Sequence, residues 1–158
     1  MVCEHEPVRG DHILFPHQML TCIYGLVERD DASRSWQYRY AVAGHPAALL
    51  VTPSGETRFL DGGRSMLLGM DPDEHRPESV ERLAPRSTVL LYTDGLVERR
   101  SEDLDRRLAR LRQHAAALAR EPLGVFCDEL LTGLADEGTD DIAMIAVRTG
   151  VAETGAHS

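Results

Sequence analysis

The chain has 158 residues and a formal net charge of −9, from 17 basic and 26 acidic side chains. Its length fits one domain with a single hydrophobic core, and its apolar fraction of 42 % excludes a disordered chain. The acidic balance argues against a general nucleic-acid binder, which needs a basic surface to neutralise phosphates. One arginine-rich stretch, 99–112, is interleaved with acidic residues, which indicates the solvated face of a helix; the alternative is a local nucleic-acid patch.

Three scattered cysteines indicate reduced thiols and no disulfide framework. No apolar run approaches the ~20 residues of a membrane span. We therefore expect a cytoplasmic protein that has no membrane partner.

Residues 1–19 show no hydrophobic period and are expected to be irregular, followed by a strand over 20–28. Apolar and polar residues then alternate from Trp36 to Val42, which predicts a half-buried strand that forms a hairpin with the first. The turn residues Gly44-His45-Pro46 end this strand. Further strands are predicted over 47–51, 57–60, 79–83, 89–92 and 142–147. The runs at 89–92 and 142–147 are short and continuously apolar, which is typical of buried strands.

Between these two runs the hydrophobic period becomes helical. One apolar stripe predicts a helix with Ser101 as its N-cap, and it comprises Leu104, Leu108, Leu111, Ala115 and Leu118. A second stripe follows Pro122 and comprises Leu123, Phe126, Leu130 and Leu134. Strands, then two helices, then one closing strand predict an α+β fold with antiparallel sheet. We expect the domain to span 20–149 and to be followed by a flexible tail, 150–158.

Two aspartates lie at the ends of the two buried strands. Asp94 follows the run 89–92, and Asp140 precedes the run 142–147. If these strands pair antiparallel, both carboxylates meet at one rim of a sheet. Carboxylate oxygens suit a hard cation such as Mg²⁺ or Mn²⁺. Each aspartate alone is more typical of a turn residue beside a strand, so it is their conjunction that favours a metal site.

The segment Val89–Glu98 (VLLYTDGLVE) resembles the strand-and-turn motif of the PPM-type, metal-dependent serine/threonine protein phosphatases, and especially of their bacterial SpoIIE-like branch. Three further segments agree with that branch in order and spacing: 40–50 (YAVAGHPAALL), 67–69 (LLG) and 139–147 (TDDIAMIAV). The resemblance covers most of the chain, from about residue 20 to residue 148. Four motifs in register are much more specific than one.

The resemblance implies a sandwich of two antiparallel sheets flanked by helices, with Mg²⁺ or Mn²⁺ at one end. It also implies hydrolysis of a phosphoserine or phosphothreonine by a metal-bridging water. By position, Asp94 and Asp140 correspond to the family's metal-binding, catalytic aspartates, and Asp141 ranks second. The implied partner is a regulatory phosphoprotein such as an anti-sigma-factor antagonist.

The chain also departs from the family pattern. The family's other metal ligands come from an earlier Asp and Gly-His-Gly motif, and the nearest string, Arg9-Gly10-Asp11-His12, follows no apolar run. We therefore expect the C-terminal part of a phosphatase domain whose first strands are missing, with an exposed sheet edge that permits self-association. Two functions stay open: an active phosphatase, or an inactive remnant that binds a protein partner. For His45, the alternatives are stabilising its turn and approaching a phosphate.

Overall fold

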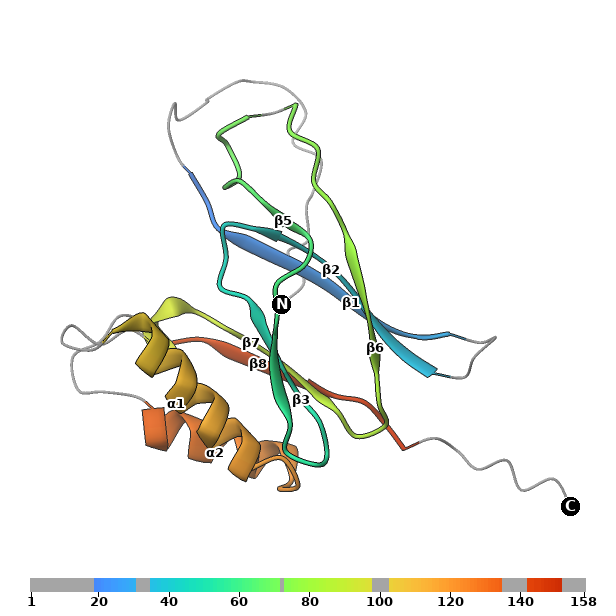
Figure 1. Cartoon of the computed structure of the whole chain (residues 1–158), viewed down its shortest axis with the longest axis vertical. Coiled ribbons are helices and arrows are strands. Elements are labelled where there is room, and N and C mark those ends of the chain that lie inside the picture. The colour runs from blue at the N-terminus through green and yellow to red at the C-terminus, as the bar shows by residue number, and fades with distance from the viewer. Residues whose placement is uncertain (1–18, 31–34, 72, 98–102, 135–141, 152–158) are drawn as a thin grey trace, which may run out of the picture.

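The computed structural model describes residues 19–30, 35–71, 73–97, 103–134 and 142–151. One sheet contains strands β1 (Cys22–Asp30), β2 (Ser35–Ala43), β5 (Arg64–Ser65) and β6 (Ser79–Leu83). The other sheet contains β3 (Ala48–Val51), β4 (Thr57–Leu60), β7 (Thr88–Tyr92) and β8 (Met144–Arg148). The helices are α1 (Leu104–Ala117), α2 (Leu123–Leu134) and the short 3₁₀ helix η1 (Asp94–Leu96). Figure 1 shows three layers, with the second sheet between the first sheet and the helices α1 and α2.

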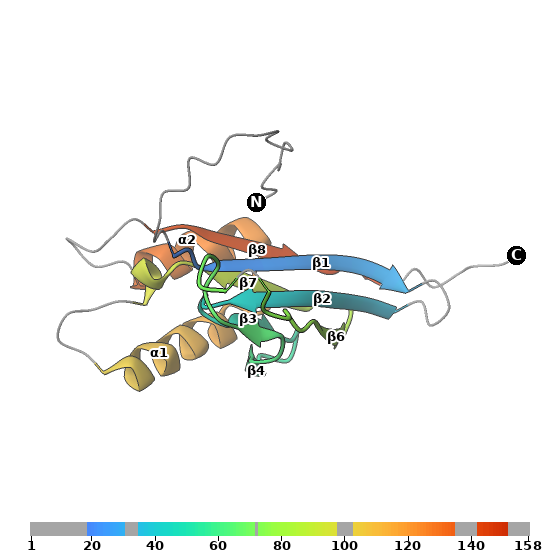
Figure 2. The same ribbon diagram turned by 90° about the horizontal axis from the view of Figure 1, so that it is seen from above.

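Antiparallel pairing dominates both sheets. In the first, β1 and β2 form a hairpin from Cys22 opposite Ala43 to Asp30 opposite Ser35, and β6 pairs with the other side of β2. Only the two-residue strand β5 runs parallel to β2. In the second sheet the order is β4-β3-β7-β8, and all three pairings are antiparallel. Figure 2 shows β1 and β2 crossing in front of the second sheet.

Two apolar layers hold the sandwich together, and the central strands β3 and β7 contribute to both. Side chains of β3 alternate, so that Leu50 packs between the sheets while Leu49 and Val51 pack against the helices. The buried helix residues facing them include Phe126 and Leu130 of α2. Burial on both faces explains why these strands appear in the sequence as continuous apolar runs instead of alternating ones.

The structure confirms the α+β class, the β1–β2 hairpin and both helices. It corrects three local predictions. Helix α1 has Asp103 and not Ser101 at its N-cap, because the Asp103 carbonyl accepts the first helical hydrogen bond, from the Arg107 amide at 3.2 Å. Leu104 is 52 % exposed and therefore lies outside the buried stripe. In addition, the structure contains strand β5, for which no prediction was made because two residues carry no period.

The third correction concerns β8, which was expected to be buried. It lies at the edge of the second sheet. Met144 and Ala146 pack against the core on the helix side, whereas Ile145 and Val147 are 36 % and 39 % exposed. The first sheet thus covers the other face of β8 only in part.

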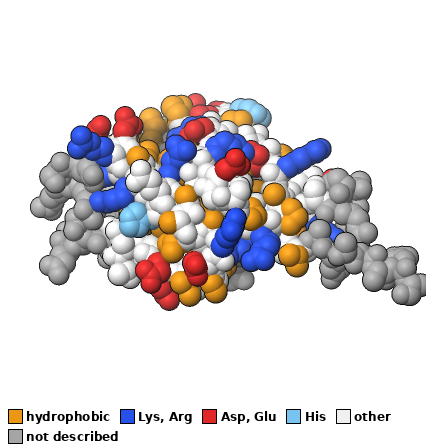
Figure 3. Space-filling view, turned by 60° about the horizontal axis from the view of Figure 1, so that its bottom comes forward, with side chains coloured by type: hydrophobic (Ala, Val, Ile, Leu, Met, Phe, Trp, Pro, Cys, Tyr) orange, Lys and Arg blue, Asp and Glu red, His pale blue; other side chains and the backbone are white. Residues whose placement is uncertain are grey.

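The helix layer presents charges of both signs to solvent. Figure 3 views the molecule from this side and shows basic and acidic side chains interspersed with separate apolar ones. Within α1, Arg112 also donates hydrogen bonds of 3.1 Å to the side chain and to the carbonyl of Thr57 in β4. None of the described helices is long and apolar enough to cross a membrane. The expected terminal segments lie almost entirely outside the described residues, so the predicted domain limits stay predictions.

Position 25 in β1 requires a glycine because the Tyr38 side chain lies against it. A Cβ at this position would lie 2.3 Å from side-chain atoms of Tyr38, a buried residue that stacks on Tyr40 with ring centroids 4.9 Å apart. We expect Gly25→Ala to lower the free energy of unfolding by about 1–3 kcal/mol, the usual cost of overpacking. Gly124 of α2 has open space around it, so Gly124→Ala should instead stabilise the protein by up to ~1 kcal/mol. Urea unfolding measures the free energy of unfolding of both variants. Equal changes in the two variants would contradict the steric role assigned to Gly25.

Strand β1 is an edge strand of nine residues that pairs only with β2 among the described residues. Its outer face exposes Tyr24 (69 %) and Leu26 (44 %). Long apolar edges favour pairing with another chain, so we expect the protein to self-associate as its concentration rises. Leu26→Lys should weaken this association, while Val125→Lys on the exposed surface of α2 should not. Sedimentation velocity over a concentration series measures the self-association of each protein. A wild type that stays monomeric at every concentration would refute the expectation.

Candidate active site

The pairing of β7 with β8 defines the end of the sandwich at which the predicted site lies. The ladder runs from Thr88 opposite Arg148 to Tyr92 opposite Met144. Thr93 then extends it by one step. Its amide donates to the Ala143 carbonyl at 2.9 Å, and the Ala143 amide donates to the Thr93 hydroxyl oxygen at 3.0 Å. The antiparallel pairing on which the predicted site was conditional is therefore present.

Asp94 comes directly after this last step and opens η1. Gly95, Leu96 and Val97 are buried behind it, whereas Asp94 itself is exposed. Within the described residues, the hydrogen bond that its carboxylate accepts comes from the Gly95 amide, at 3.0 Å. The buried residues thus fix the turn and leave the carboxylate at the surface, where it can bind a ligand.

Asp140, the other predicted ligand, and Asp141 lie outside the described residues. The meeting of the two carboxylates therefore stays a prediction. Among the residues that are described, no three His, Cys, Asp or Glu side chains are grouped so that they could hold a metal ion.

Asp94 lines a cleft of about 560 Å³. Its walls come from both sheets and from the start of α1. The polar side chains that line it include His45, Asp61, Arg64 and Thr93, and the apolar ones include Phe59, Leu104 and Leu108. Asp94 and His45 were predicted from the sequence, whereas Asp61 and Arg64 were not. These two flank the Gly62-Gly63 turn, and this pattern of opposite charges around a tight turn was the available signal.

His45 connects the two sheets beside this cleft. Its Nε2 lies 3.2 Å from the Tyr92 carbonyl, which can only accept, so Nε2 carries the proton. In the neutral ring Nδ1 then accepts from the Thr21 hydroxyl, 3.4 Å away. Burial lowers the pKa of His45, and this outweighs the opposing influence of the Tyr92 carbonyl and the Asp94 charge. The partners of His45 lie in β7 and before β1, outside its own turn, so these contacts join different segments of the chain. The approach of His45 to a phosphate stays a prediction.

Comparison with known proteins identifies the family. The model of the family described as Stage II sporulation protein E (SpoIIE) matches residues 6–150. The chain therefore belongs to the SpoIIE family of PPM-type phosphatase domains.

Solved structures with a similar fold include the following three. The RsbU and RsbW domains of Rv1364c from Mycobacterium tuberculosis are 31 % identical, with a TM-score of 0.64 over 72 % of this chain and 34 % of that one. The phosphatase domain of the cell fate determinant SpoIIE from Bacillus subtilis is 13 % identical, with a TM-score of 0.55 over 83 % and 59 %. The SiaA-PP2C domain of Pseudomonas aeruginosa is 22 % identical, with a TM-score of 0.52 over 72 % and 49 %. This chain thus spans between about a third and three fifths of these structures.

The lowered pKa of His45 predicts a pH effect on stability. As the pH falls through the ordinary value of 6.5, the unfolded chain takes up a proton on this imidazole before the folded chain does. The folded state therefore loses stability in this range. We expect the wild type to lose more free energy of unfolding than His45→Gln between about pH 7.5 and pH 5.5. Urea unfolding at each pH measures this, and the other histidines cancel in the comparison. Equal losses in both proteins would contradict the assigned environment.

Proposed function

We propose that the chain is a metal-dependent protein serine/threonine phosphatase, which hydrolyses the phosphomonoester of a phosphoserine or phosphothreonine in a regulatory protein. The observation that carries this proposal is the β7–β8 ladder, which ends at Thr93 and Ala143 beside a cleft lined by the exposed carboxylate of Asp94. Membership of the SpoIIE family supports the reaction class.

In this proposal Asp94 and Asp140 hold Mg²⁺ or Mn²⁺. The donor chemistry at Asp94 fits such an ion, because the carboxylate is exposed in the cleft and hard cations prefer carboxylate oxygens. A crystal of the Bacillus subtilis SpoIIE phosphatase domain was presoaked with Mn, which supports the choice of metal. When bound, such ions lower the pKa of a coordinated water and neutralise charge on the phosphoryl oxygens. The chain's own contribution is to fix the Asp94 backbone through Thr93 and to close the back of the turn with buried Leu96.

The proposed substrate is a cytoplasmic signalling protein, such as a phosphorylated anti-sigma-factor antagonist. Support comes from the Mycobacterium tuberculosis structure, in which an RsbU domain that this chain resembles occurs together with an RsbW domain.

One observation favours a second function. The sequence contains no counterpart of the family's earlier Asp and Gly-His-Gly metal motif. Two carboxylates leave most of the six or more coordination positions of a hard cation to water. If the residues of this chain supply all of the metal ligands, the alternative function is an inactive phosphatase domain that binds a protein partner through the same cleft.

Substitution of the proposed ligands tests the reaction. Asp94→Asn and Asp140→Asn should each lower Mn²⁺-dependent hydrolysis of a phosphoserine peptide by at least about a hundredfold, because metal catalysis supplies several kcal/mol of transition-state stabilisation. Asp128→Asn on the exposed side of α2 is the matched control and should keep full activity. Phosphate release gives the rate, and calorimetry with Mn²⁺ gives binding. Wild-type turnover that survives in Asp94→Asn would refute the assignment of the ligands, and no wild-type turnover would favour the second function.

A further inference from the structure

We propose that Arg64 binds the substrate's phosphate group in this cleft, and that Asp61 holds the guanidinium in place until the phosphate replaces it. The ligand class is the phosphomonoester dianion of serine or threonine. This inference rests on the proposed function for its biological meaning, but the binding it describes can be measured without catalysis.

The backbone of Arg64 is fixed by hydrogen bonds, whereas its side chain is half exposed and is held by Asp61. Arg64 opens β5, where it lies opposite Val42 of β2, and the Val42 amide donates to the Gly63 carbonyl at 2.7 Å. The next residue, Ser65, donates from its hydroxyl to the Val42 carbonyl at 3.1 Å, and Arg76 donates to the Ser65 hydroxyl oxygen at 2.9 Å. The Arg64 side chain itself is 51 % exposed. The Arg64 guanidinium thus extends into solvent from a backbone that hydrogen bonds hold in place.

Arg64 and Asp61 line the same cleft as Asp94. Their side chains form an ion pair with each other. A basic and an acidic group are therefore held side by side at the wall of this cleft.

The ion pair between Arg64 and Asp61 is weak enough for a phosphate group to take the place of the Asp61 carboxylate. The N–O distance is 3.1 Å and the Asp61 side chain is 72 % exposed. An exposed pair of this kind contributes little stability. A phosphate dianion offers a guanidinium more charge and the geometry for two parallel hydrogen bonds. Phosphate should therefore displace the carboxylate.

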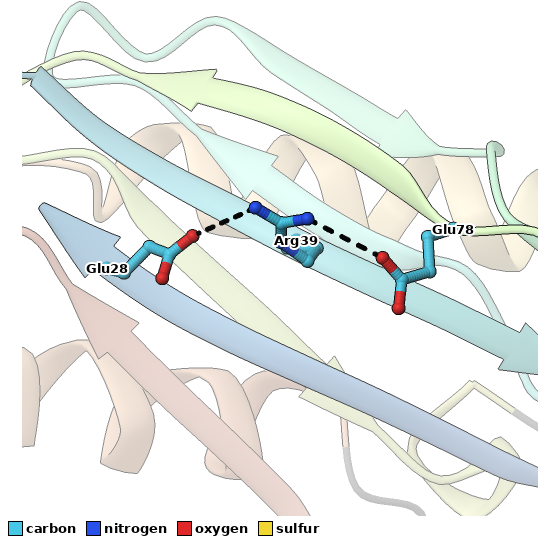
Figure 4. A network of polar contacts seen from close by, with 3 residues as sticks. All are labelled: Glu28, Arg39 and Glu78. Atoms are coloured by element: carbon cyan, nitrogen blue, oxygen red, sulfur yellow. Dashed lines mark hydrogen bonds and ion pairs between the residues drawn. The ribbon is translucent and has the colours of Figure 1, made fainter. Parts of the chain in front are cut away.

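No other permanent cation on the described walls of the cleft competes with Arg64. The chain contains no lysine, and Arg64 is the one arginine among the described residues that line the cleft. His45 already uses both ring nitrogens, for the Tyr92 carbonyl and the Thr21 hydroxyl. Arg39 lies between Glu28 and Glu78, 3.3 Å and 3.7 Å away, on β2 of the first sheet (Figure 4).

The experiment compares four variants of the full chain: Arg64→Ala, Arg64→Lys, Asp61→Asn and the control Arg58→Ala. Arg58 is a matched control because it is 56 % exposed and paired with Glu81, yet does not line the cleft. The probe is O-phosphoserine, with serine as its neutral counterpart, in an NMR titration without metal. Thermal melting of each variant verifies folding, which substitution of an exposed side chain should leave unchanged.

We expect Arg64→Ala to weaken O-phosphoserine binding by about tenfold or more, because a charge-assisted, two-pronged contact is lost. The affinity of Arg64→Lys should lie between those of the wild type and Arg64→Ala, because lysine keeps the positive charge but lacks the planar guanidinium. Asp61→Asn should tighten O-phosphoserine binding by roughly two- to fivefold, because the phosphate no longer has to break an exposed ion pair, and such a pair contributes a free energy of about this size. Arg58→Ala should bind as the wild type does. With Mn²⁺ and a phosphoserine peptide, the Arg64 variants should show their loss mainly in KM.

The outcomes separate this inference from the proposed function. If the wild type shows no turnover but O-phosphoserine binding follows the expected order of variants, the docking role of Arg64 stands and the phosphatase proposal fails. If the wild type hydrolyses the peptide while Arg64→Ala keeps its affinity and its KM, the docking role is overturned and the phosphatase proposal stands. Equal binding of serine and O-phosphoserine by the wild type would also overturn the docking role.

Discussion

The antiparallel ladder between β7 and β8 holds together the parts of the molecule on which the candidate site depends. It joins residues about fifty to sixty positions apart, so its formation must overcome the entropy of closing a long loop. Both ends of the ladder are reinforced by side chains. At the cleft, the Thr93 hydroxyl accepts from Ala143. At the far end, Arg148 donates to the Thr88 hydroxyl oxygen at 2.8 Å and lies over the Phe126 ring, 5.8 Å from its centroid. A slip of one residue would break both contacts and exchange the two faces of β8.

The cleft lies where strand ends and turns from both sheets meet, so a rigid sandwich positions its polar groups. His45 ties the segment before β1 to the end of β7, and its partners on opposite ring nitrogens favour the neutral imidazole. The turn after β7 brings Asp94 to the cleft, and the connection between β4 and β5 brings both Asp61 and Arg64 to it. The exposed carboxylate of Asp94 and the cationic side chain of Arg64 thus belong to residues that line the same space, and this arrangement would suit the proposed metal-assisted phosphate chemistry.

Local patterns were enough to predict most elements of the fold. The alternation from Trp36 to Val42 indicated a half-buried strand, because a strand places successive side chains on opposite faces. The helical stripe of α2 was correct through Phe126, Leu130 and Leu134. The errors have a common cause, since the start of α1, the brevity of β5 and the partial exposure of β8 depend on neighbours distant in sequence.

The sequence by itself determined most of the elements and the resemblance to the family, and it singled out the carboxylate of Asp94. These follow from hydrophobic period, turn residues and motifs, all of which are local properties of the chain. Only the tertiary structure decided that Arg64 and Asp61 share a cleft with Asp94, and that His45 bridges two sheets. The physical reason is that such contacts form between side chains positioned by packing across both apolar layers, and no local period records which turns that packing brings together.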